Sequence, residues 1–147
     1  MMAHEQLENL VRIGRLKAES PSPAEITGLV RSGLARLKDA KLDHLSIESR
    51  FDLAYNAAHA LSLAALRIAG YRAHSRYIVF QCLRHTLDFP NQQWRVLDLA
   101  HRRRNLSEYE GDPELEEPLV EALIRAAEEV ASRVSQHHPE ALPLQES

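Results

Sequence analysis

The stretch over residues 51–70 constrains the fold of this chain more than any other. It contains seven alanines, and its larger apolar side chains recur at helical spacing, so the predicted helix is apolar almost all the way round. Such a helix is usually central to a bundle, and small alanine side chains let neighbouring helices approach closely. The pattern therefore predicts a central bundle helix, with Ser46 or Ser49 as its N-cap and Gly70 at its C-terminal end.

The segments on either side also show helical periodicity. Apolar spacing predicts further helices over about residues 3–17, 23–40, 74–89, 92–111 and 113–137. Ser22 and Pro23 form a typical helix start, with Glu25 three residues after the cap. Residues 77–80 alone would suit a strand, but no second strand candidate exists to pair with them, so a helix is predicted there. The expected fold is all-α, an up-and-down bundle of five to six helices without a sheet.

The length of 147 residues predicts one structural domain. Within it, residues 1–45 are expected to form an N-terminal helical extension packed on the bundle, and residues 46–138 the bundle itself. Residues 139–147 follow a helix-breaking proline and are expected to form a flexible tail.

Composition excludes several classes of protein. The net charge of −3 excludes a generally polycationic nucleic-acid binder but allows a local basic patch. The single cysteine, Cys82, excludes an internal disulfide and lies in an apolar run, which predicts a buried thiol. The histidines lack metal-binding spacing and no glycine-rich phosphate loop occurs, so neither metal nor cofactor is predicted. No apolar run suits a membrane span or a signal peptide, which predicts a cytoplasmic protein without membrane contact.

The stretch over residues 94–111 carries most of the side-chain chemistry and reads WRVLDLAHRRRNLSEYEG. On a helix, Arg102, Arg103 and Arg104 point about 100° apart, so they cannot all face one way. His101 precedes Arg104 by three residues and Asn105 by four, so these three can share a face. Two interpretations remain open: a phosphate-binding guanidinium beside a proton-transferring histidine, or a solvated basic helix end with His101 packed at a helix interface.

Two aromatic side chains of the central helix extend this set. Tyr55 and His59 lie one turn apart on the same face. A histidine in such a place is most often satisfied within a core or a groove. Both residues are nevertheless candidates for contact with a bound phosphate.

Two stretches of this chain resemble HEPN domains. The first, SRFDLAYNAAHALSLAALRIAGYR, looks like the tyrosine- and alanine-rich helix of that family with its following glycine. The second, HRRRNLSEYEG, looks like the late motif of the family. In that motif an arginine is followed by Asn, Asp or His, and a histidine stands four to six residues after the arginine. The resemblance covers roughly residues 46–135, and Arg104 and Asn105 match the first two motif positions.

The resemblance implies an all-α bundle that forms homodimers, with the arginine motifs of both protomers meeting in a cleft. Many members of the family are metal-independent ribonucleases of toxin, CRISPR and stress systems. Others bind nucleotides or partner a minimal nucleotidyltransferase encoded beside them. In the nucleases the histidine assists proton transfer for the 2′-hydroxyl, and the arginine stabilises charge on the phosphate.

This chain departs from the motif because Tyr109 stands where the histidine would be. A phenol with a pKa of about 10 is a poor base near neutral pH. The preferred interpretation is therefore a weakly catalytic or non-catalytic module. It would bind nucleotide or RNA phosphates through Arg102, Arg103 and Arg104, with Tyr55 and His59. One alternative is a ribonuclease in which His101 or Tyr109 acts with Arg104 and Asn105. Another is an interaction subunit for a nucleotidyltransferase or an antitoxin.

Helical geometry adds two expectations. On a regular helix Arg104 and Tyr109 are about 140° apart. The helix is therefore expected to loosen over residues 107–111, or the pair to be completed across a dimer. Arg104 is expected to be more buried than Arg102, which points about 200° away from it.

Overall fold

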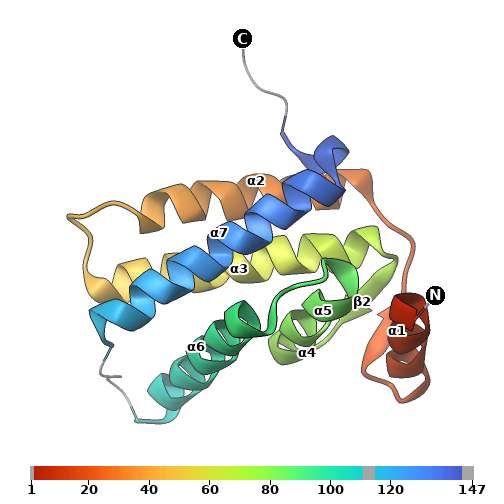
Figure 1. Ribbon diagram of the computed structural model, residues 1–147, viewed down its shortest axis with the longest axis horizontal. Coiled ribbons are helices and arrows are strands. Elements are labelled where there is room, and N and C mark those ends of the chain that lie inside the picture. The colour runs from red at the N-terminus through yellow and green to blue at the C-terminus, as the bar shows by residue number, and fades with distance from the viewer. Residues whose placement is uncertain (1, 111–114, 144–147) are drawn as a thin grey trace.

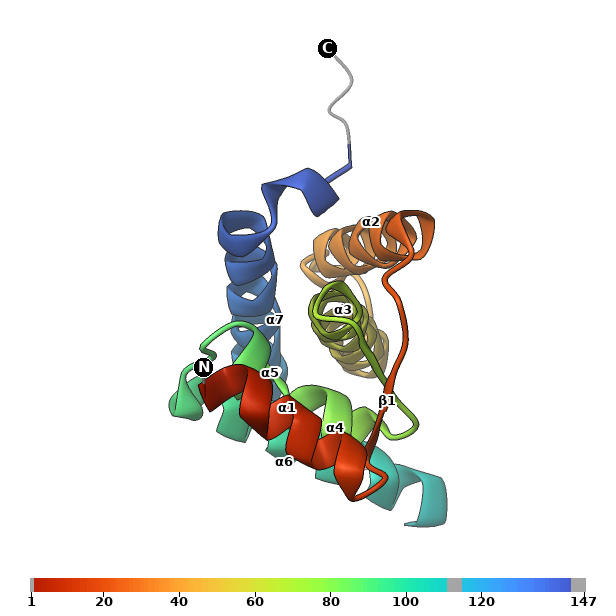
Figure 2. The same ribbon diagram turned by 90° about the vertical axis from the view of Figure 1, so that its right-hand side faces the viewer.

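The computed structural model describes residues 2–110 and 115–143. Three long helices, α2 (Pro23–Ala40), α3 (Ile47–Ile68) and α7 (Glu117–His137), lie side by side, with α3 packed against both others (Figure 1). A second group comprises α1 (Met2–Arg12), α4 (Arg76–Gln81), α5 (Leu83–Thr86) and α6 (Asn91–Glu110), and it crosses beneath the first (Figure 2). The predicted all-α helical bundle is confirmed.

The central position of α3 follows from its composition. Its alanines are almost completely buried, and α2 and α7 pack against them. The predicted N-caps are confirmed, because Ser46 Oγ accepts a hydrogen bond from the backbone N–H of Ser49 and Ser22 Oγ accepts one from Glu25. After α3 the chain turns at Gly70, whose φ of 96° lies in the left-handed region that favours glycine.

The N-terminal segment differs from the prediction in two ways: its helix is shorter, and a short strand follows it. The first helix ends at Arg12, not near residue 17, because Gly14 adopts a φ of 80° and turns the chain. The next residues form β1 (Leu16–Ala18), which pairs antiparallel with β2 (Tyr71–Ala73). The expectation of no sheet was therefore wrong. Strands of three residues are too short to leave a readable alternation in the sequence.

The fourth predicted helix is divided in two. Residues 77–80 are helical, as predicted, but the helix stops at Cys82, which ends α4 and precedes the single turn of α5. The last helix begins at Glu117, because Pro118 suits only the first turn; residues 111–114 lie outside the described part of the chain. After it, Pro139–Ala141 forms a 3₁₀ turn. Ala141 is buried in the core, so the expectation of a flexible tail was wrong for residues 139–141.

Buried apolar side chains form two clusters. The larger one fills the space between α2, α3, α6 and α7. The smaller one joins α1, both strands and α4, and comprises Leu7, Leu16, Leu66, Tyr71, Ile78, Val79 and Cys82. Cys82 is fully buried, as predicted, and burial raises the pKa of its thiol to about 12. Within the described residues, no helix is both long and apolar enough to span a membrane.

Gly33 lies where α2 packs closely against α3. A Cβ atom at this position would lie 2.7 Å from Leu61 Cγ, and Leu61 is fully buried. We therefore expect Gly33→Ala to lower the free energy of unfolding by about 1–2 kcal/mol, as overpacked cores do. The urea midpoint at an unchanged m-value would measure this effect.

Gly28 provides the matched control in the same helix. It is exposed, and a Cβ atom there would meet no other atom within 4 Å. Gly28→Ala should stabilise the protein by up to about 1 kcal/mol, because alanine favours helix. Equal effects of the two substitutions would contradict close packing at Gly33.

Candidate functional site

Polar and aromatic side chains from three helices surround the ring of Tyr55, which is fully buried. We call this group the Tyr55 cluster. Its members are Tyr55, Asn56 and His59 from α3, Arg76, Tyr77 and Phe80 from α4, and His101, Arg104 and Asn105 from α6. The cluster therefore depends on the packing of α4 and α6 against α3.

His101 is held through both ring nitrogens. Its Nδ1 lies 2.9 Å from Tyr55 Oη, and its ring stacks on that of Tyr55 at 6.3 Å between centroids. Its Nε2 lies 3.2 Å from the side-chain nitrogen of Asn105, one turn further along α6. An amide nitrogen only donates, so in this arrangement Nε2 accepts and the proton of the neutral imidazole lies on Nδ1. Tyr55 and Asn105 thus together hold the His101 ring in its orientation.

Two guanidinium groups contact the Tyr55 ring. The Cζ atom of Arg104 lies 5.0 Å from the ring centroid and that of Arg76 lies 5.6 Å from it, both within cation–π distance. Arg76 also donates a hydrogen bond of 3.4 Å to Asn56 Oδ1. One aromatic side chain therefore positions two cations from different helices.

His59 lies in the same positive field. Its ring packs edge-on against Phe80, at 6.0 Å between centroids. Burial first, and then the charges of Arg76 and Arg104 and the neighbouring His101, lower the pKa of His59 to about 4. The His59 imidazole is consequently neutral near pH 7.

The structure brings together five of the predicted site residues, namely Tyr55, His59, His101, Arg104 and Asn105. The predicted order of burial for the arginines is confirmed. Arg104 is half-buried, whereas the Arg102 side chain is 72% exposed and pairs with Asp98 at 3.1 Å. Arg103 is half-buried.

Two expectations concern the end of α6. The helix continues without interruption to Glu110, so the expected loosening was wrong for residues 107–110. Gly111 and the side chains of Glu108 and Tyr109 lie outside the described part of the structure. Whether Tyr109 completes the site therefore stays a prediction.

Sequence reasoning missed the four members Asn56, Arg76, Tyr77 and Phe80. A signal for three of them existed, because Arg76, Tyr77 and Phe80 follow the N-cap Ser75 at positions that share one helical face. Their meeting with Tyr55 depends on the turn at Gly70, which directs α4 back along α3. No local pattern encodes that direction.

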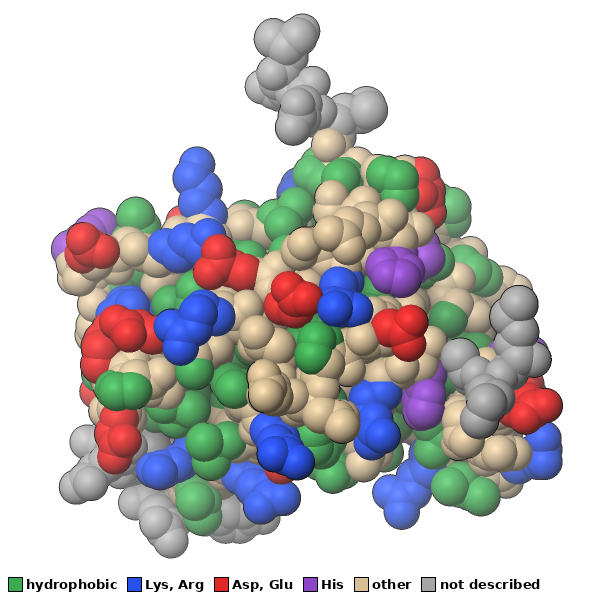
Figure 3. Space-filling view, viewed as in Figure 1, with side chains coloured by type: hydrophobic (Ala, Val, Ile, Leu, Met, Phe, Trp, Pro, Cys, Tyr) green, Lys and Arg blue, Asp and Glu red, His purple; other side chains and the backbone are tan. Residues whose placement is uncertain are grey.

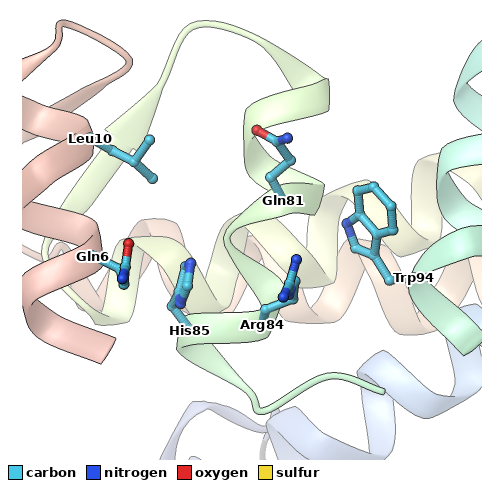
Figure 4. A pocket seen from close by; sticks show the side chains of 6 residues that line it. All are labelled: Gln6, Leu10, Gln81, Arg84, His85 and Trp94. Atoms are coloured by element: carbon cyan, nitrogen blue, oxygen red, sulfur yellow. The ribbon is translucent and has the colours of Figure 1, made fainter. Parts of the chain in front are cut away.

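A separate cavity of about 190 Å³ lies between α1, α4, α5 and α6. Figure 4 shows that its lining side chains come from four helices and face a common space. These side chains are Gln6, Leu10, Gln81, Arg84, His85 and Trp94. Trp94 links this cavity to the Tyr55 cluster, because its Nε1 donates a hydrogen bond of 3.1 Å to the backbone oxygen of Phe80.

The surface shows where charge gathers. In the view of Figure 3, basic side chains lie along the lower part of the molecule, where Figure 1 places α4, α5 and α6. Among the described residues, no group of three or more His, Cys, Asp or Glu side chains is arranged to hold a metal ion. The chemistry of the cluster therefore rests on arginine, imidazole, phenol and amide groups.

Comparison of the chain with protein-family models, with curated proteins and with solved structures finds no match.

Proposed function

We propose that this chain is a HEPN-like module that binds the phosphates of a nucleotide or RNA through Arg104 and is weakly catalytic or non-catalytic. One observation carries the proposal. The tyrosine of the alanine-rich helix and the arginine of the polar stretch, 49 positions apart in the sequence, contact each other at 5.0 Å. These are the residues through which the chain resembles HEPN domains.

The surroundings of Arg104 suit phosphate binding. A guanidinium presents its donors in a planar fork that matches two phosphate oxygens. The Tyr55 ring restrains this fork, so less side-chain entropy is lost when a ligand is bound. Half-burial of Arg104 lowers the local dielectric constant and strengthens its attraction for an anion.

A weak metal-independent ribonuclease is the second candidate, and the orientation of His101 favours it. A general base needs one ring nitrogen free of its proton and the other nitrogen held in place. In His101, Nδ1 is held at Tyr55 Oη, and Nε2 would serve as the base when a substrate hydroxyl displaces the side chain of the exposed Asn105. Cleavage of a fluorogenic RNA that His101→Gln abolishes, without loss of RNA binding, would favour the nuclease over the binding module.

We further propose that the module acts as a homodimer with α6 at the interface. Leu99 and Leu106 are 46% and 51% exposed and lie two turns apart on one face of α6. Exposed leucines on a site-bearing helix support a contact with a second copy. We expect a dimeric mass in solution at tens of micromolar, shifted towards the monomer by Leu99→Glu with Leu106→Glu. A strictly monomeric wild type would contradict the dimer.

The binding proposal predicts a large loss of affinity at Arg104 and a small one at the neighbouring Arg102. Arg104→Ala should weaken binding of a fluorescein-labelled oligouridylate at least tenfold, about 1.4 kcal/mol, because it removes the restrained phosphate ligand. Arg102→Ala should cost much less, because that side chain is exposed and pairs with Asp98. Anisotropy titrations at two salt concentrations measure both, and the wild-type affinity should fall as salt rises. Small, equal effects of the two substitutions would mean that the arginines form only a solvated helix end.

A further inference from the structure

Arg76 differs from the other half-buried or buried arginines outside α6. Arg50, Arg67, Arg72 and Arg133 each pair with a glutamate. Within the described part of the chain, no carboxylate pairs with Arg76, whose contacts are an amide oxygen and an aromatic ring. A half-buried cation without a counter-ion is costly unless an anion that binds there offsets it.

The contacts of Arg76 aim it at the proposed site. Asn56 Oδ1 accepts from one terminal nitrogen of the guanidinium, and the Tyr55 ring contacts the guanidinium carbon at 5.6 Å. Arg104 contacts the same ring at 5.0 Å. Two fixed positive charges therefore converge on one side chain, although they come from α4 and α6.

The pKa of His59 reflects the positive field that these two charges create. After burial, the charge of Arg76 is the largest cause that lowers the pKa of the His59 imidazole, followed by that of Arg104. The neutral imidazole adds no further positive charge near pH 7. The two guanidinium groups thus both add positive potential beside His59 and the Tyr55 ring.

We propose that Arg76 is a second phosphate ligand of the Tyr55 cluster, and that the site prefers a doubly charged terminal phosphate to an internal phosphodiester. This inference rests on the proposed function and adds to it the class of phosphate bound. A terminal phosphate carries a charge between about −1.5 and −2 at pH 7 and offers three acceptor oxygens. An internal phosphodiester carries a single negative charge. The terminal group can therefore offer separate oxygens to two guanidinium forks, and its second negative charge strengthens both contacts.

The test compares two dinucleotides that differ in one group. One is a uridine dinucleotide with a 5′-phosphate, and the other is the same molecule with a 5′-hydroxyl. Inorganic phosphate serves as a third probe and shows whether the terminal group binds without the nucleoside. Calorimetric titrations at low salt give the affinities, because exposed charges are least screened there.

The wild type should bind the 5′-phosphorylated dinucleotide at least about tenfold more tightly than its unphosphorylated counterpart. Arg76→Gln should remove most of that preference and change the affinity for the 5′-hydroxyl form little. Arg76→Lys should restore part of the preference, because it returns the charge without the planar fork. Arg84→Gln is the matched control, since Arg84 is an exposed arginine on the neighbouring α5 outside the cluster, and it should change neither affinity.

Two results would overturn the inference and leave the proposed function intact. The first is equal wild-type affinity for the two dinucleotides. The second is a folded Arg76→Gln protein that keeps the full preference. Failure of every probe to bind, or unchanged binding in Arg104→Ala, would instead overturn the proposed function itself.

Discussion

Arg67→Met is expected to lower the free energy of unfolding by about 3–5 kcal/mol, the usual cost of breaking a buried ion pair by removing one partner. The Arg67 side chain is 1% exposed near the end of α3. It donates hydrogen bonds of 2.7 to 3.2 Å to Glu25 Oε1 and to the backbone oxygens of Glu19, Ser20 and Tyr71. Methionine would fill most of the space but supply none of these donors. Urea unfolding of the two proteins measures the loss.

Arg72 provides the control for this prediction. It pairs with the carboxylates of Glu19 and Glu25 at 2.7 Å, but its side chain is 34% exposed, so water can replace much of what it provides. Arg72→Met should therefore lower the free energy of unfolding clearly less than Arg67→Met does. Equal losses of unfolding free energy would mean that Arg67 stabilises the fold through the glutamate carboxylates and not through the buried carbonyl oxygens.

The Arg67 effect should depend on pH. The hydrogen bond from Arg67, followed by that from Arg72, lowers the pKa of Glu25 below its usual 4.5. A lowered folded-state pKa means that this stabilisation is present above pH 4.5 and is lost as the pH falls through the lowered value. The difference between wild type and Arg67→Met should therefore narrow in acid. A difference that stays constant from pH 7 to pH 3 would argue against the Glu25 contact.

Tyr55→Ala should affect both stability and binding, because the ring lies in the core and also carries the site. Removal of a fully buried aromatic ring costs about 3–5 kcal/mol. The same change removes the surface against which Arg76 and Arg104 lie, so binding of the labelled oligouridylate should fall by more than in Arg104→Ala. Unfolding and anisotropy measurements on the same preparation report the two effects.

Tyr55→Phe separates the hydroxyl from the ring. The ring contacts with Phe80 and the guanidinium groups should survive, whereas His101 Nδ1 would lose its partner at 2.9 Å. We expect Tyr55→Phe to lower the free energy of unfolding by about 1–3 kcal/mol through this lost hydrogen bond. Most of the affinity for the labelled oligouridylate should remain. Binding as weak as in Tyr55→Ala would show that the hydroxyl, not the ring, positions the site.

The sequence predicted the parts of the fold that depend on short-range pattern. Alanine content placed α3 at the centre, and Ser22 and Ser46 marked helix starts, because caps act within three residues. The errors occur where long-range contact decides. Leu16 continues the apolar stripe of the first helix, but Gly14 turns the chain so that Leu16 pairs with Ala73 across 57 positions. Such pairing leaves no local trace.

The candidate site divides in the same way. Helical spacing could place His101, Arg104 and Asn105 on one face of their helix, and Tyr55 and His59 on one face of the central helix. Arg76 could not be placed, because its contact with Tyr55 depends on how α4 returns along α3. Arg67 gave no signal either. A basic residue in the last turn of a helix usually interacts with the helix dipole in solvent, and only the packed chain shows that it is buried.

Because Cys82 is buried in the smaller apolar cluster, its thiol can report local opening of the protein. The only thiol of the chain lies in the cluster that Leu7 of α1 and Leu16 of β1 help to close, and its high pKa keeps it protonated. A thiol reagent can therefore react only during moments when this cluster opens. The labelling rate would measure how often the N-terminal segment separates from the bundle, without any substitution or added probe. Cys82 terminates α4, so a ligand that binds at the Tyr55 cluster and stabilises α4 would lower the rate of Cys82 labelling.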